Sequence, residues 1–161
     1  MTSASRTQAK DLHVIIAGAG RVGHRTARVL EDYGHDAYLT DPGPEATAGA
    51  KELLRSTVIE GDATNPTVLG QADPERADIL AALTDEGPTN FAICAEAKHL
   101  AGKIRTIARI EHPDGLDTGE EFVDRIVYPE RAGAKAAVNQ ILTGDTRVFE
   151  DVTGDLDVAE V

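Results

Sequence analysis

Three glycines, Gly18, Gly20 and Gly23, follow an apolar run at the spacing G-x-G-x-x-G. In a dinucleotide-binding turn, the first glycine permits a tight turn, the second lets a pyrophosphate approach bare backbone, and the third lets the next helix pack closely on the strand. That helix presents unpaired N–H groups and a partial positive charge to the phosphates. The motif alone is weak evidence, so the surrounding elements must supply its context. The residues predicted to surround the phosphates are Gly18, Ala19, Gly20, Arg21, Val22 and Gly23.

Asp41 stands 18 residues beyond Gly23, at the end of a second strand-like segment. A carboxylate near this distance accepts hydrogen bonds from the hydroxyl pair of a ribose and disfavours the extra phosphate of NADP. The alternative is a helix cap, since the sequence Asp-Pro-Gly-Pro also begins a helix well. The two roles are compatible, and the position of Asp41 relative to the glycines favours ribose binding.

Strand and helix patterns alternate along most of the chain. Short apolar runs that predict strands cover residues 12–17, 36–40, 57–60, 78–83, 103–110 and 125–128. Helical patterns follow the glycine turn, cover residues 44–55 and 129–142, and begin again at Asn65-Pro66 and at Pro88. This rhythm predicts an α/β, Rossmann-like fold: a doubly wound parallel sheet of six strands in the order 3-2-1-4-5-6. The ligand crevice then lies between strands 1 and 4.

Two further local expectations follow from the same patterns. In the helix after the glycine turn, one stripe at helical spacing contains Val22, Thr26, Val29, Leu30 and Tyr33. Residues 112–121 are polar and contain glycine, so we expect a weak helix or a loop there.

The length suits one compact domain with short extensions. We expect a flexible polar arm over residues 1–11, a nucleotide-binding domain over residues 12–143, and an acidic linker over residues 144–161 that ends like the first strand of a missing domain. No apolar run approaches a membrane span, and no secretory signal precedes residue 12. The single cysteine, Cys94, lies in an apolar helical pattern and is expected to be a buried packing residue.

Sixteen basic and 28 acidic residues give a formal charge of −12. A surface of this sign repels nucleic acid and anionic membranes, so neither is an expected direct partner. Lysine is scarce, whereas Asp, Glu and Ala are abundant. This bias is typical of halophilic proteins, because dense salt screens the repulsion between crowded carboxylates. The alternative is a protein that is merely acidic.

A set of short sequences in a fixed order resembles the N-terminal nucleotide-binding domain of Trk-type potassium-uptake regulators, the TrkA-N group, also termed RCK or KTN domains. The resemblance spans residues 12–143. Its markers are GAGRVG at 18–23, Asp41, GDAT at 61–64, Ala77-Asp78, LTD at 83–85 with Asn90 beyond, IAR at 107–109 and YPE at 128–130. Residues 85–88 depart from the more usual acid-rich turn, and the C-terminal regulatory domain of the family is absent or represented by its first strand.

The resemblance implies a cytosolic sensor that binds adenine nucleotides, with ATP, ADP and NAD(H) as the ligands of the family. It implies homodimers or larger rings that assemble on a membrane potassium channel or transporter, at the inner face of the cell membrane. It further implies that the ligand changes the angle between paired domains and that this movement gates the pore. The chain itself is not expected to insert into the membrane.

Two candidate residues lie beside the expected phosphate and adenine positions. Arg21, inside the turn, is placed to form a bidentate hydrogen bond to a terminal phosphate. Its alternative is a surface arginine, although a cation at a helix start opposes the helix dipole. Asp62 follows the third strand, where it is placed to accept a hydrogen bond from the amino group of adenine, with Ala63 leaving room for the ring. Its alternative role is an Asx turn before Thr64.

Three more candidates end later elements. Thr84 ends the fourth strand across the crevice from Gly18, where it either touches ribose or phosphate or caps the turn. Arg109 ends the fifth strand, in reach of phosphates of its own or a paired subunit, or it makes an ordinary ion pair. Relatives place a glutamate at the position of Glu130 near the phosphates of the neighbouring subunit, sometimes with a divalent cation such as Mg²⁺. The helix dipole alone also accounts for an acid there.

The leading interpretation is a non-enzymatic, nucleotide-sensing regulatory subunit of a potassium channel or transporter. One alternative is an NAD-dependent oxidoreductase, which needs a general acid or base and a substrate domain for which this length leaves no room. A second alternative is a stand-alone nucleotide-binding module that serves another partner. Which nucleotide binds stays open, because an acidic ribose ligand suits ATP, ADP, AMP and NAD alike. The scattered histidines predict no structural metal site.

The acidic composition predicts that the chain gains stability as KCl rises, because screening weakens the repulsion between its carboxylates. Thermal unfolding followed by circular dichroism across a KCl series measures this effect. An unfolding midpoint that stays constant or falls with rising salt would contradict the halophilic interpretation.

Overall fold

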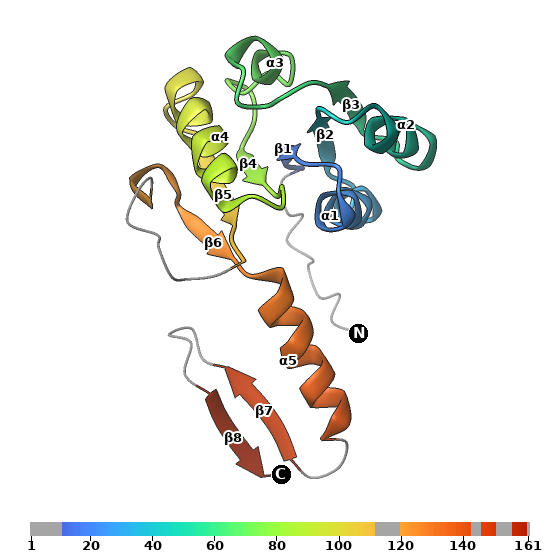
Figure 1. Ribbon diagram of the computed structural model, residues 1–161, viewed down its shortest axis with the longest axis vertical. Coiled ribbons are helices and arrows are strands. Elements are labelled where there is room, and N and C mark those ends of the chain that lie inside the picture. Colours follow the sequence, from blue (N-terminus) through green and yellow to red (C-terminus); the bar gives the residue numbers. More distant parts are fainter. Residues whose placement is uncertain (1–10, 112–119, 143–145, 151–155, 161) are drawn as a thin grey trace, which may run out of the picture. The chain divides into compact units, whose positions relative to one another are not determined.

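The computed structural model describes residues 11–111, 120–142, 146–150 and 156–160 (Figure 1). Its contacts divide the chain into two units, Met1–Val127 and Tyr128–Val161, each with an architecture of its own. Within the described part of the chain, no helix is both long and apolar enough to cross a membrane.

The first unit is built on one parallel sheet. Its strands are β1 (His13–Ala17), β2 (Asp36–Asp41), β3 (Thr57–Glu60), β4 (Ile79–Ala82), β5 (Arg105–Arg109) and β6 (Arg125–Val127). They lie in the order β3-β2-β1-β4-β5-β6, which confirms the predicted topology. At the centre, Ile16 of β1 pairs with Leu39 of β2 on one side and with Ala81 of β4 on the other. The strand order reverses between β1 and β4, so their carboxyl ends flank the crevice at which such folds bind ligands.

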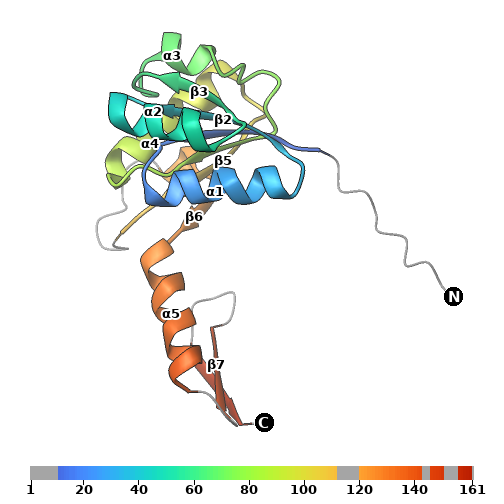
Figure 2. The same ribbon diagram turned by 90° about the vertical axis from the view of Figure 1, so that its right-hand side faces the viewer.

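Helices cover both faces of this sheet (Figures 1 and 2). They are α1 (Arg21–Asp32), α2 (Pro44–Leu53), α3 (Pro66–Gly70) and α4 (Gly87–Leu100). On one face, Ala27 of α1 and Ala50 of α2 are fully buried in a cluster that contains Val14, Ile16 and Leu39 of the sheet. α4 packs against β4 and β5 and contacts α3. Alanine at the contact points lets the helix backbones approach the strands closely.

The buried face of α1 differs from the predicted stripe. The buried residues of the helix are Gly23 and Ala27, whereas Val29 is 43% and Tyr33 is 75% exposed. The cause is the glycine turn, because a Cβ at Gly23 would overlap the carbonyl oxygen of Gly18. The helix therefore packs through its smallest residues, and part of the apolar stripe turns toward solvent.

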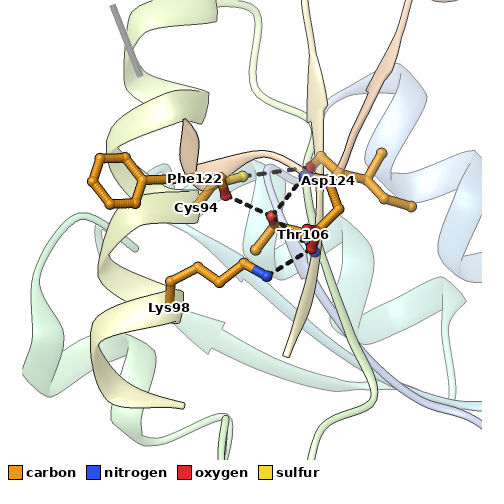
Figure 3. A network of polar contacts seen from close by, with 6 residues as sticks. Cys94, Lys98, Thr106, Phe122 and Asp124 are labelled. Carbon is orange, nitrogen blue, oxygen red and sulfur yellow. Dashed lines mark hydrogen bonds and ion pairs between the residues drawn. The ribbon is translucent and has the colours of Figure 1, made fainter. Parts of the chain in front are cut away.

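A polar network links the segment just before β6 to both β5 and α4 (Figure 3). Asp124 accepts a hydrogen bond from the N–H of Thr106 at 2.8 Å and pairs with Lys98 Nζ at 2.7 Å. The buried hydroxyl of Thr106 donates to the carbonyl oxygen of Phe122 at 2.6 Å. Cys94 of α4 is fully buried, as predicted, and burial raises the pKa of its thiol to about 12. It therefore stays protonated and serves packing.

The second unit holds α5 (Pro129–Ile141) and an antiparallel pair of strands, β7 (Thr146–Glu150) and β8 (Leu156–Glu160). The helix confirms the pattern seen over residues 129–142. Its contacts group it with the strands that follow rather than with the sheet of the first unit. β8 falls within the strand-like end of the sequence, whereas β7 was not predicted.

Two expectations concern residues that lie largely outside the described ranges. Of the arm predicted over residues 1–11, the structure describes Asp11 alone. Of the weak helix or loop predicted over residues 112–121, it describes the start of a short 3-10 helix, η1 (Glu120–Phe122).

Gly23→Ala is expected to destabilise the first unit by roughly 1–3 kcal/mol, because the added methyl group overlaps backbone that moves only if the turn opens. Chemical denaturation followed by circular dichroism gives the free energy of unfolding. Gly49→Ala is the matched control, since no described atom lies within 4 Å of the Cβ position at Gly49 in α2. This control is expected to stabilise the helix by roughly 0.5–1 kcal/mol. Equal effects of the two changes would contradict the close packing at Gly23.

The pKa of Asp124 is lowered, chiefly by its hydrogen bond from Lys98 and then by the bond from the Thr106 N–H. A carboxyl group with a lowered folded-state pKa stabilises the fold above its unfolded pKa of about 3.9, and this stabilisation is lost as the pH falls through the folded value. Asp124→Asn is therefore expected to lower stability at neutral pH and to leave a smaller difference from the unmodified chain below about pH 3. The free energy of unfolding against pH measures this, with the exposed Asp32→Asn as control. A difference that does not depend on pH would show that the charge of Asp124 has no role.

Candidate functional site

The glycine turn closes tightly against the ends of two strands. Gly18 adopts a φ of +107° and donates its N–H to the carbonyl oxygen of Thr40 at 2.8 Å. A Cβ at Gly18 would lie 2.9 Å from the backbone nitrogen of Thr84, just beyond β4. Glycine is therefore required at this position both for its backbone conformation and for its lack of a side chain. The turn brings the carboxyl ends of β1, β2 and β4 together.

The second glycine of the motif faces open space. Gly20 is the N-cap of α1, with a φ of −70°, and no described atom lies within 4 Å of its Cβ position. In this fully described helix, no side chain caps the start and no acid stands in the first turn. The helix start therefore offers N–H groups beside bare backbone, which is the chemistry that binds a phosphate.

Asp41 braces the glycine turn from the end of β2. Its Oδ2 accepts a hydrogen bond from the N–H of Ala19 at 2.8 Å, and its Oδ1 accepts one from the N–H of Gly43 at 2.7 Å. The cap of α2 is Gly43 rather than Asp41, so the helix-cap alternative is replaced by a local Asx turn. Because each carboxylate oxygen accepts about two hydrogen bonds, Asp41 keeps acceptor capacity for a ribose.

Asp62 forms the Asx turn that the sequence offers as its alternative role. Its Oδ1 accepts hydrogen bonds from the N–H and the hydroxyl of Thr64, at 2.9 and 2.7 Å. The backbone bond, followed by the hydroxyl bond, lowers the pKa of Asp62. The neighbouring Ala63 is buried. A carboxylate has about four acceptor positions, so this turn leaves room for a ligand contact.

A buried amide joins the ends of β4 and β5. Asn90 of α4 is fully buried, and its Oδ1 accepts hydrogen bonds from the N–H and the hydroxyl of Thr84 at 3.0 and 2.7 Å. Its Nδ2 donates to the carbonyl oxygens of Thr84 and Arg109 at 3.0 and 2.8 Å. All four hydrogen-bonding positions of the amide are used. Asn90 thus fixes the two strand ends relative to each other.

A cavity of about 340 Å³ opens where these residues meet, at the carboxyl ends of β1 to β4. Four acidic residues are among those that line it: Asp41, Asp62, Asp85 and Glu86. Among the described residues of its lining, none is Lys, Arg or His. The cavity therefore accepts hydrogen bonds, whereas the adjoining helix start donates them.

Two larger hollows, of about 560 and 590 Å³, lie at the opposite edge of the sheet, where strands begin. In the first, Arg55 lies 3.9 Å from Glu31, which also accepts hydrogen bonds from the N–H and hydroxyl of Ser56, both at 2.6 Å. Arg76 lines both hollows and lies 3.7 Å from Asp73. These charged groups have partners within the protein, and doubly wound sheets bind ligands at the carboxyl ends of their strands. The smaller cavity is therefore the better candidate.

The structure brings most of the predicted site residues together. The cavity is lined by Gly18, Asp41, Asp62, Ala63 and Thr84, and the adjoining turn and helix start comprise Ala19, Gly20, Arg21, Val22 and Gly23. Arg109 ends β5, where its side chain is 12% exposed and lies 3.8 Å from Glu111. It is not among the described residues that line the cavity. Glu130 lies in the first turn of α5, in the second unit.

Sequence reasoning gave no role to Asn90, although it is a marker of the family resemblance. Its signal is a polar residue within an otherwise apolar buried helix face, six residues after Thr84 at the end of a strand. Asp85 and Glu86, which depart from the family pattern, also line the cavity, and the sequence does not predict this role for them.

The donor and acceptor set fits a nucleotide better than a resident metal ion. Among the described residues, no group of three or more His, Cys, Asp or Glu side chains is arranged to hold a metal ion. The open backbone at Gly20 suits a phosphate, and the carboxylates of the cavity suit hydroxyl and amino donors. Both kinds of group occur in one molecule in a nucleotide.

Comparison with known proteins identifies the family of the chain. Residues 14–129 match the family model described as the TrkA-N domain. The chain is 38% identical over 138 residues to a Trk system potassium uptake protein TrkA homolog of Pyrococcus abyssi, covering 82% of this chain and 61% of that protein. It is 36% identical to the corresponding protein of Pyrococcus horikoshii, covering 86% of this chain and 64% of that protein. The chain thus spans about three fifths of the length of the curated relatives it matches.

Solved structures share the fold. The TrkA-N domain of the inner membrane protein ybaL from Escherichia coli has a TM-score of 0.71 at 22% identity, over 83% of this chain and 99% of that one. The GsuK channel bound to NAD has a TM-score of 0.72 at 18% identity, over 89% of this chain and 26% of that one. GsuK bound to ADP has a TM-score of 0.67 at 19% identity, over 80% of this chain and 35% of that one. The family model, the curated relatives and the sheet order together show that this chain belongs to the TrkA-N domain family.

Proposed function

We propose that the chain binds an adenine nucleotide at the carboxyl ends of β1 to β4 and acts as the nucleotide-sensing domain of a potassium channel or transporter system. The observation that carries this proposal is the pairing of two surfaces: the uncapped start of α1 at Gly20 and the adjoining cavity lined by carboxylates. The first is suited to phosphates and the second to the hydroxyl and amino groups of a nucleoside.

Each part of the nucleotide has a proposed partner. The phosphates lie on the backbone of residues 18–23, where the guanidinium of Arg21 supplies a cation at the exposed start of α1. The ribose hydroxyls donate to Asp41 at the end of β2. The adenine amino group donates to Asp62, beside the small side chain of Ala63. Because Asp41 also holds Ala19, ribose binding and the position of the phosphate turn are coupled through one carboxylate.

The regulatory role is supported by the relatives. The curated relatives are named as potassium uptake proteins, and GsuK, which shares the fold, is described as a channel with NAD or ADP bound. We propose that this chain likewise acts in the cytoplasm, at the inner face of the membrane, paired as a homodimer or ring on a potassium-transporting partner. In such a pair, Arg109 and Glu130 of one subunit approach the phosphates of another, with Mg²⁺ accompanying ATP.

The cavity is poorly suited to an oxidoreductase. The titratable groups of its described lining are carboxylates, and the pKa of Asp62 is lowered rather than raised toward neutrality. A group that transfers a proton at neutral pH needs a pKa near 7. We therefore propose a binding and signalling role without catalysis.

Calorimetric titration of the purified chain with ATP, ADP, AMP, NAD and NADH, with and without Mg²⁺, tests the proposal directly. Saturable binding of at least one of these nucleotides is the expected result. If none binds, the proposed function fails. Co-purification of the full-length protein with a membrane potassium transporter tests the regulatory role, and capture of an unrelated membrane protein instead would point to a different partner.

Gly20→Leu is expected to block nucleotide binding while the fold is kept, because the Cβ position is open but the side chain fills the space of the phosphates. The loss of affinity is measured by calorimetry, with thermal unfolding as the check on folding. Gly70→Leu is the matched control, since Gly70 is also exposed and open but lies at the end of α3. Undiminished affinity in Gly20→Leu would contradict the phosphate turn.

Asp41→Ala is expected to weaken nucleotide binding by about 1–3 kcal/mol, through loss of hydrogen bonds from the ribose and of the brace on Ala19. Asp36→Ala, at the other end of β2, is the control. Calorimetry measures the affinities, and unchanged binding in Asp41→Ala would refute its role.

A further inference from the structure

The orientation of the Asn90 amide is fixed by its surroundings. Its Nδ2 faces two backbone carbonyl oxygens, those of Thr84 and Arg109, which can only accept hydrogen bonds. Its Oδ1 faces the backbone N–H of Thr84, which can only donate. A flipped amide would set donor against donor and acceptor against acceptor in a fully buried place.

This orientation determines what the Thr84 hydroxyl does. The hydroxyl has one proton, and it lies 2.7 Å from Asn90 Oδ1 but 3.3 Å from the carbonyl oxygen of Glu86. The shorter contact takes the proton, so the hydroxyl offers lone pairs to its remaining neighbours. One of these is the N–H of Glu86, which donates at 3.3 Å. Toward the cavity, Thr84 is therefore an acceptor.

The surroundings of Thr84 in the cavity have the same polarity. Asp85 and Glu86 follow it directly and line the same side of the cavity, beyond the end of β4. Among the described lining residues, no cation offsets these two carboxylates. Phosphate oxygens only accept hydrogen bonds and carry negative charge, so they are disfavoured here, whereas a sugar hydroxyl donates to Thr84 without a charge conflict.

We propose that Asn90 is a positioning residue that makes Thr84 a hydrogen-bond acceptor, so that the β4 side of the crevice takes a ribose rather than a terminal phosphate. This assignment rests on the proposed nucleotide function and narrows it. A nucleotide whose diphosphate lies on the glycine turn has its adenosine at β2 and β3 and its remaining group at β4. The site is therefore selective for ligands with a second ribose, the class to which NAD belongs.

ADP-ribose and ATP are the ligand pair that tests this assignment most directly, because both contain ADP and extend it by one group, a ribose or a phosphate. Calorimetry in EDTA, at constant salt, gives the ratio of their affinities for the unmodified chain. ADP-ribose is expected to bind at least about tenfold more tightly than ATP. It gains one hydrogen bond to Thr84 and avoids the repulsion between a terminal phosphate and the nearby carboxylates, and together these contribute more binding free energy than a tenfold change in affinity requires. Equal affinities, or tighter binding of ATP, would overturn the assignment.

Two variants separate a positioning role from a structural one. Thr84→Val removes the acceptor and is expected to weaken ADP-ribose about three- to tenfold without weakening ATP, whereas Thr84→Ser keeps the preference. Asn90→Ala frees the Thr84 proton for donation and is expected to shift the ratio toward ATP. Thr67→Val, on α3, is the control. A purely structural role would weaken both ligands alike and leave their ratio unchanged.

The outcomes distinguish this assignment from the function on which it rests. If the unmodified chain binds neither ligand, the proposed function and the assignment fail together. If both bind and the ratio is the same in the unmodified chain, Thr84→Val and Asn90→Ala, the assignment alone is overturned. Should Asn90→Ala not fold, as thermal unfolding would show, Thr84→Val and Thr84→Ser decide the result between them.

Discussion

The contact between the backbones of Gly18 and Gly23 is the constraint on which the rest of the site depends. It holds the start of α1 against the end of β1 so closely that no side chain fits between them. The helix start is consequently left uncapped at Gly20, and Asp41 reaches across from β2 to hold the N–H of Ala19. The proposed phosphate-binding surface is thus made of backbone groups whose positions follow from packing, not from flexible side chains.

The two sides of the site have opposite electrostatic character. The start of α1 offers N–H donors and the positive end of the helix dipole, whereas the cavity offers carboxylates and an acceptor hydroxyl. A ligand that joins a phosphate to hydroxyl and amino donors satisfies both, while an isolated anion or cation satisfies one. The proposed nucleotide is therefore compatible with an acidic chain, because its phosphates lie at the helix start and its hydroxyl and amino donors lie in the cavity.

α4 is fastened to the sheet at both of its ends. Near its start, Asn90 holds the carbonyl oxygens that end β4 and β5. Toward its end, Lys98 pairs with Asp124, which also binds Thr106 of β5 (Figure 3). The buried side chains at these points, Asn90 and Thr106, have their hydrogen bonds satisfied, so they hold the helix in one register on the strands. The proposed ligand contact at Thr84 therefore lies on a part of the fold whose position is fixed by these hydrogen bonds.

The sequence by itself determined the sheet order, the glycine turn and five residues of the cavity lining, Gly18, Asp41, Asp62, Ala63 and Thr84. It could do so because strand and helix periodicity and the conformational role of glycine are local properties of the chain. Tertiary structure alone decided the buried face of α1, where close approach at Gly23 outweighed the apolar stripe that includes Tyr33. It also decided that Asp41 binds Ala19, that Asn90 orients Thr84, and which unit contains α5. These features depend on atoms brought together from distant segments, and residue spacing along one segment carries no record of such contacts.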